Sequence, residues 1–197
     1  MSKAVLISIR PKWVEKIVNG EKTIEVRKTK PKLQTPFKCY IYCSAGGDKL
    51  WIRDAVWRER WMGGPISFLV NAKKCGGMNI GNGKVIGEFT CDRIDRLAPA
   101  DEPYGIYDIG DDYVLQTCLE NGALWDYGHG TPLYGWHISD LLIYDHPREL
   151  TEFRRATDPC DSCQAEYTWE CKDCKKLGGD IKRPPQSWCY VEAMKDE

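Results

Sequence analysis

The sequence predicts an α+β protein: a small β-barrel with short helices, followed by a small Cys-rich tail. Five or six apolar segments have the length and alternation of strands, and the candidate helices between them are short. Those helices do not alternate regularly with the strands, which argues against a doubly wound sheet. Five of the ten cysteines crowd into the last forty residues. We therefore place the main domain over residues 1–150 and the tail over 151–197.

The first forty residues carry clear local signals. The apolar run Ala4–Ile9 predicts a buried strand. Pro11 suits the first turn of a helix, because the N–H that proline lacks has no partner there in any case. Asn19-Gly20 ends this helix with a glycine suited to a left-handed cap. Residues 23–28 alternate in polarity and predict a second strand.

The rest of the main domain follows the same reasoning. Gly76–Gly83 contains four glycines and predicts a loop, and Gly87 predicts a bend within a long strand. Residues 98–110 are acidic and contain Pro and Gly, so they predict a connection. We expect strands over 38–43, 66–71, 84–97 and 136–144, and helices over 48–61 and 111–121.

Composition limits the class of protein. No segment has the roughly 18 apolar residues that a membrane span needs, and Ala4–Ile9 is too short for a signal peptide. We therefore expect a cytoplasmic protein with no membrane partner. The net charge is −1, but residues 1–40 hold ten Lys or Arg against three Glu. This asymmetry either forms a basic face that attracts phosphate or is an ordinary solvated surface.

The tail carries the clearest chemical pattern. Cys160-x-x-Cys163 and Cys171-x-x-Cys174 are two knuckles, each able to place two thiolates on one metal ion. Together they predict a tetrahedral structural zinc site with no open position. Cys189 either replaces one ligand or stays free.

The other cysteines and the three histidines show no such pattern. Cys39 and Cys43 lie four residues apart on a predicted strand, so they face the same way as small buried thiols. No P-loop and no G-x-S-x-G motif is present.

A polar cluster follows the first helix. Lys22, Thr23, Glu25 and Arg27 lie where the helix turns into the second strand, with Glu25 and Arg27 on one face. They form either a surface ion pair or a polar cluster at the mouth of a small barrel. In a binding site, Arg27 and Lys22 would hold phosphate or a base edge, and Glu25 would accept from an exocyclic amine.

These residues carry a resemblance to a known family. Ile7-Ser-Ile-Arg10-Pro11, a helix with Trp13, and Gly20-x-Lys22-x-x-Glu25-x-Arg27 resemble the ASCH family. The likeness continues in segments 40–44, 85–89 and 135–138, and covers about residues 4–146. It implies a PUA-like barrel, related to RNA-binding domains, with a cleft beside the first helix.

The resemblance leaves two functions open. Some ASCH relatives hydrolyse acetylated cytidine with a lysine of the G-x-K stretch, a threonine shortly after it and a distant glutamate; others are ribonucleases. Lys22 matches the lysine, but the position three residues later holds Glu25, and Thr23 is out of register. Glu88 is the candidate for the distant carboxylate.

We therefore expect a non-catalytic module that binds RNA or a nucleoside through Lys22, Glu25, Arg27 and Glu88. The alternative is a hydrolase acting on that ligand. A third option is a protein-interaction module that uses exposed aromatic residues. The tryptophans do not decide between the options, since Trp13, Trp51 and Trp136 suit core positions as well as stacking platforms.

The doubled knuckle generates a direct test. We expect elemental analysis of the purified protein to find one zinc ion per chain, bound by Cys160, Cys163, Cys171 and Cys174. Cys171→Ser should loosen residues 155–190 and leave the main domain folded, if the tail is a separate module. A protein without zinc, or a disulfide between Cys160 and Cys163, would contradict the prediction.

Overall fold

The main element of the fold is an eight-stranded mixed sheet. The computed structural model describes residues 2–46, 50–53, 68–70, 78–100, 106–156 and 179–194. The strand order is β10-β9-β11-β1-β3-β7-β8-β2. β1 and β3 run parallel, and all other neighbours are antiparallel. The strands are β1 Lys3–Ile9, β2 Ile24–Arg27, β3 Phe37–Cys43, β7 Val85–Leu97, β8 Leu133–Arg148, β9 Arg154–Arg155, β10 Gly179–Asp180 and β11 Trp188–Glu192.

Both faces of the sheet are covered, which explains the continuous apolar run in β1. Val5 and Ile7 join a core cluster with Trp136 on one face. Leu6, between them, joins a second cluster with Val191 on the other face. Neighbouring residues of a strand point to opposite faces, so a strand buried on both sides loses the alternation of a half-exposed one.

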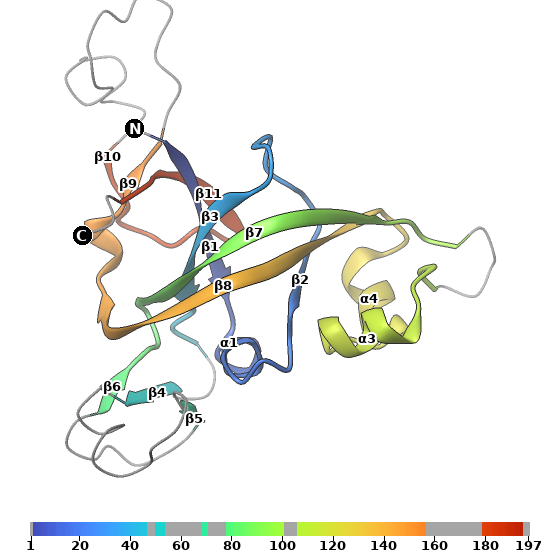
Figure 1. The fold of residues 1–197 in the computed structure, drawn as a ribbon, viewed down its shortest axis with the longest axis horizontal. Helices are drawn as coiled ribbons and strands as arrows, with labels where there is room; N and C mark the ends of the chain where they lie inside the picture. Colours follow the sequence, from blue (N-terminus) through green and yellow to red (C-terminus); the bar gives the residue numbers. More distant parts are fainter. Residues whose placement is uncertain are drawn as a thin grey trace, which may run out of the picture.

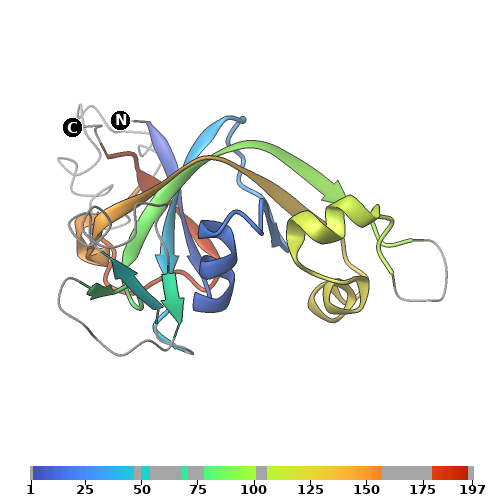
Figure 2. The same cartoon turned by 60° about the horizontal axis from the view of Figure 1, so that its bottom comes forward.

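Two long strands form a ribbon across the molecule. β7 and β8 pair along most of their length and carry helices α3, Asp111–Thr117, and α4, Asn121–Gly128, at one end (Figures 1 and 2). The register shifts between Val85 and Gly87. A Cβ atom built on Gly87 would lie 2.3 Å from the backbone oxygen of Leu142. The bend predicted at Gly87 is therefore a site where the two backbones approach each other closely.

The first helix forms as its sequence predicts. α1 spans Pro11–Val18, with Pro11 at its first turn and Val14 and Ile17 buried. Gly20 follows with a φ of +76°, in the left-handed region that glycine adopts most easily. The predicted helix over 111–121 is shorter than expected: α3 ends at Thr117, because Cys118 adopts a φ of 53° in the left-handed region.

A second, smaller sheet corrects another expectation. β4, Leu50–Arg53, pairs with β5, Phe68–Val70, and with β6, Met78–Ile80. The predicted helix over 48–61 is thus wrong at its beginning, where the aromatic and β-branched residues of β4 favour a strand. The predicted strand over 66–71 contains β5, and the predicted loop over 76–83 contains β6.

The described part of the predicted tail is built into the main sheet. A 3-10 helix, Leu150–Glu152, leads into β9, and β11 pairs antiparallel with β1 from Lys3 opposite Glu192 to Ile7 opposite Trp188. Residues 179–194 therefore belong to the main sheet and do not form a separate module, in contrast to the expectation behind Cys171→Ser. No helix in the described ranges is long and apolar enough to cross a membrane.

Gly87 provides a stability test. We expect Gly87→Ala to lower the free energy of unfolding by about 2 kcal/mol, because the added methyl group meets backbone that cannot move aside. Gly122→Ala is the control: a Cβ atom there meets nothing within 4 Å, and alanine favours the helix. Urea unfolding of both variants checks this, and equal stability would contradict the close approach.

Candidate functional site

A pocket opens beside the first helix, where five segments of the chain meet. Its volume is about 570 Å³, within the range of about 300–1,000 Å³ that is typical of small-molecule sites. The segments are the end of β1 with the start of α1, the turn into β2, the end of β3, helix α4 and the loop before β11. The residues that line it are Ser8, Ile9, Arg10, Lys12, Trp13, Lys22, Glu25, Val26, Arg27, Tyr42, Ser44, Ala45, Leu119, Ala123, Tyr127, Pro184, Pro185, Gln186 and Ser187.

The turn after α1 directs the key side chains into this pocket. The backbone N–H groups of Glu21 and Lys22 both donate to the Lys16 carbonyl, which fixes the turn around Gly20. The N–H of Thr23 then donates to the Gln116 carbonyl at the end of α3. β2 continues as an edge strand against β8, with Glu25 opposite Trp136.

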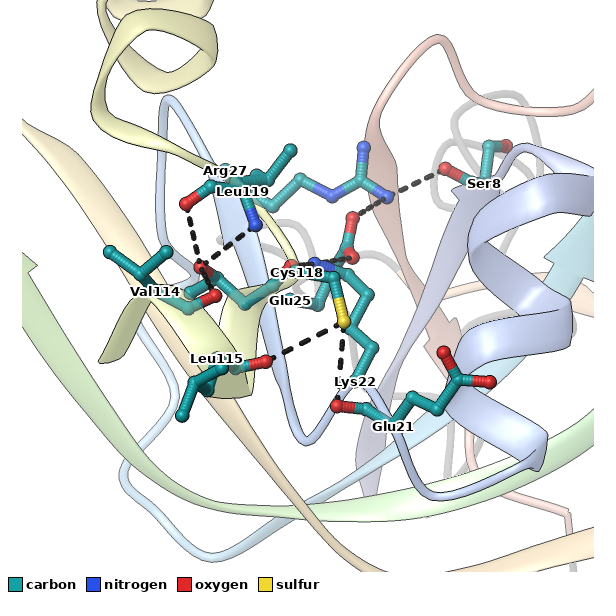
Figure 3. A network of polar contacts seen from close by, with 10 residues as sticks. Ser8, Glu21, Lys22, Glu25, Arg27, Val114, Leu115, Cys118 and Leu119 are labelled. Atoms are coloured by element: carbon teal, nitrogen blue, oxygen red, sulfur yellow. Dashed lines mark hydrogen bonds and ion pairs between the residues drawn. The ribbon is translucent and has the colours of Figure 1, made fainter. Parts of the chain in front are cut away.

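A buried ion network lies at the centre of the site (Figure 3). Lys22 Nζ is 3.4 Å from Glu25 Oε2, and Arg27 Nη2 is 3.0 Å from Glu25 Oε1. The three residues are 2%, 6% and 9% exposed, respectively. The network holds two cations and one anion, so it keeps one positive charge away from bulk water.

Two backbone carbonyls that are not part of the ion network accept hydrogen bonds from Lys22 and Arg27. Lys22 Nζ donates to the Thr117 carbonyl at 2.6 Å, and Arg27 Nη2 donates to the Ser8 carbonyl at 2.7 Å. Arg27 Nε is buried without a hydrogen-bond partner among the described residues. A lysine held by a carbonyl and a carboxylate acts as a fixed donor, which suits binding an anion or a polar base edge.

Trp13 adds an aromatic wall. Its half-buried indole lies 5.3 Å from Lys22 Nζ and 4.5 Å from Lys12 Nζ, measured to the ring centroid. Both contacts are cation–π interactions. The pocket therefore combines cations with an aromatic surface, as nucleotide-binding sites do.

The structure brings together three of the four predicted binding residues. Lys22, Glu25 and Arg27 converge in one concavity, and their burial excludes a solvated surface ion pair. Tyr127 and the loop 184–187 also line the pocket, but nothing in the sequence relates them to β2. Trp136 is buried in the core and does not line it.

Glu88 lies elsewhere, which corrects the prediction for that residue. It does not line the pocket. Its carboxylate pairs with Lys38 Nζ at 2.9 Å and accepts a hydrogen bond from the Tyr144 hydroxyl at 2.6 Å. Burial and this hydrogen bond raise the pKa of Tyr144, which therefore stays a donor. Glu88 is held in place by these two partners on the β3 and β8 sides of β7.

Four of the five described cysteines, Cys39, Cys43, Cys91 and Cys189, are packing residues. Burial raises the pKa of the Cys43 and Cys91 thiols to about 12, and that of Cys39 well above its usual value. Cys39 and Cys43 share one core cluster, as their spacing predicts. Cys189 is buried in the other main cluster, and burial raises the pKa of its thiol.

The predicted zinc ligands Cys160, Cys163, Cys171 and Cys174 lie outside the described residues. Within the described ranges, no group of three or more His, Cys, Asp or Glu side chains is arranged to hold a metal ion. The zinc site therefore stays a prediction.

The segment that contains the turn after α1 and β2 matches a known family model. Residues 7–94 match the family model of the ASCH domain. The matched range includes Lys22, Glu25 and Arg27 and the other pocket-lining residues between Ser8 and Ala45. It confirms the resemblance found in the sequence, over somewhat less than half of the chain.

Solved structures show the same fold over most of the chain. The ASCH protein from Zymomonas mobilis is 17% identical, with a TM-score of 0.51, and the alignment covers 96% of this chain and 87% of that one. A tyrosine-to-phenylalanine variant of that protein gives 17% identity and a TM-score of 0.52, with coverage of 97% and 91%. A serine-to-alanine variant gives 16% and 0.51, with coverage of 96% and 88%. A comparison with curated proteins finds no match.

The ion network generates a second stability test. We expect Glu25→Gln to lower the free energy of unfolding by about 3 kcal/mol, because it leaves two buried cations without their shared carboxylate. Glu21→Gln is the matched control, since Glu21 pairs with Lys16 at the exposed end of the same turn and its loss should change little. Chemical unfolding checks both variants, and equal effects would refute the special role of Glu25.

Proposed function

We propose that this protein binds RNA or a nucleoside unit of RNA in the pocket beside α1, without turning it over. One observation carries the proposal: the pocket presents Lys22 and Arg27 around Glu25 next to the face of Trp13. Cations suit phosphate or base oxygens, the carboxylate suits an exocyclic amine, and the indole suits a base plane. The more general proposal, an ASCH domain with an RNA-binding or hydrolase-like function, agrees with the family match.

The second candidate, a hydrolase, has one observation in its favour. Lys22 and Glu25 form a close buried pair inside the pocket, and an amino group near a carboxylate can move a proton. Against it, Glu25 occupies the position of the threonine in hydrolytic relatives, and Arg27 contacts the same carboxylate. We therefore infer that Glu25 anchors a ligand and takes no part in proton transfer.

We also propose that the four tail cysteines bind a structural zinc ion. The support is the spacing of the two knuckles alone. With four protein ligands the metal would stabilise the tail and leave the pocket chemistry to Lys22, Glu25 and Arg27.

A titration with cytidine monophosphate tests the pocket. We expect binding to change the fluorescence of Trp13, and Arg10→Gln with Lys12→Gln to weaken it at least about tenfold, because both remove cations from the lining. Lys84→Gln is the control, since Lys84 pairs with Glu149 and does not line the pocket. Trp13→Leu should abolish the signal.

Incubation with acetylated cytidine and with RNA separates binding from catalysis. We expect no product from the unmodified protein. Hydrolysis of either substrate that disappears in Lys22→Ala, with the circular dichroism spectrum unchanged, would establish the hydrolase instead.

A further inference from the structure

Exposed cations without carboxylate partners among the described residues follow the pocket residue Arg27 along the chain. Lys28, Lys30 and Lys32 follow β2 directly, and all three are exposed. None of them forms an ion pair with a described residue. The same holds for Lys182 and Arg183, which precede the pocket loop in the chain.

Most cations on the other described surfaces are neutralised. Lys16 pairs with a carboxylate at 2.8 Å, Lys38 at 2.9 Å and Lys84 at 2.7 Å. Arg93 and Arg148 also have acidic partners. Of the ten Lys and Arg in the first forty residues, four line the pocket and three more, Lys28, Lys30 and Lys32, follow Arg27 directly in the chain. The excess positive charge of this part of the sequence is therefore concentrated in the pocket lining and in the segment that leaves it.

The segment 28–32 is fixed in place. Trp188 Nε1 donates to Thr29 Oγ1 at 3.0 Å, and the Lys32 N–H donates to the Tyr190 hydroxyl at 2.7 Å. Pro31 between them is buried. The backbone of this segment is held against β11, while the lysine side chains are exposed to solvent. A ligand that binds these lysines therefore does not have to order the backbone first, which avoids an entropic cost of binding.

Aromatic rings connect this segment with the pocket. Lys28 Nζ lies 5.0 Å from the ring centroid of Tyr127, which lines the pocket. Lys30 Nζ lies 5.7 Å from the ring centroid of Tyr134, and Arg96, also exposed, is the register partner of Tyr134 on β7. Cations and aromatic rings thus continue outward from the pocket.

We propose that Lys28, Lys30 and Lys32 form a track for the phosphate backbone of single-stranded RNA, one nucleotide of which enters the pocket. The proposal rests on the proposed function of the pocket. Like charges held close together repel one another, and phosphates relieve that repulsion while releasing counterions. A base in a duplex is stacked and paired, so a pocket that accepts one nucleotide requires a single strand.

The test compares a polymer with a monomer. We expect Lys28→Gln, Lys30→Gln and Lys32→Gln together to weaken binding of a labelled single-stranded RNA of about 12 nucleotides at least about tenfold. Fluorescence anisotropy at several salt concentrations gives the slope of the logarithm of the binding constant against the logarithm of the salt concentration. We expect the magnitude of this slope to be smaller by about 2 in the triple variant, the value for three lost phosphate contacts on a single strand. Binding of cytidine monophosphate should stay within about twofold, because the track lies outside the pocket.

A charge-matched variant provides the control. Lys16→Gln, Lys38→Gln and Lys84→Gln remove the same charge from paired sites and should leave RNA affinity nearly unchanged. The track is refuted if both triple variants lose affinity equally, if the track variant loses none, or if duplex RNA binds as well as the single strand. If cytidine monophosphate does not bind the unmodified protein, the pocket proposal fails instead, and the oligonucleotide arm still decides the track.

Discussion

Glu25 holds the functional end of the molecule together. Its two oxygens contact Lys22 and Arg27, and those cations contact the Thr117 carbonyl of α3 and the Ser8 carbonyl of β1. One carboxylate therefore connects β2 with elements on both sides of it. Because Lys22, Glu25 and Arg27 are buried, each charged group is stabilised by the other two in place of water. One positive charge remains after this pairing, and it would favour the anionic ligand proposed for the pocket.

The wall opposite this network comes from the far end of the chain. The Ser8 N–H donates to the Ser187 carbonyl at 2.9 Å, and Ser8 Oγ donates to the Pro185 carbonyl at 2.7 Å. The same residue offers its own carbonyl to Arg27. Ser8 is thus a junction where the N-terminal strand, the ion network and the loop before β11 meet, and the pairing of β1 with β11 sets the shape of the pocket.

Local signals in the sequence were sufficient for the N-terminal part of the site. Pro11 and Gly20 set the ends of α1, and alternation identifies β2, so the convergence of Lys22, Glu25 and Arg27 could be predicted. Glu88 could not be placed, because its position depends on the register of β3, β7 and β8. The loop 184–187 was assigned to a separate tail, since cysteine spacing describes metal binding and contains no information on the pairing of β11 with β1.

The position of β11 links the pocket to the order of protein synthesis. β1 is synthesised well before β11, and its edge opposite β3 stays unpaired until residues 188–192 have been made. Until then the nascent chain presents an apolar strand edge, which is a template for incorrect pairing and a recognition signal for chaperones. A chain that stops before β11 lacks both this protection and one wall of the pocket, so an incomplete product is exposed to quality control.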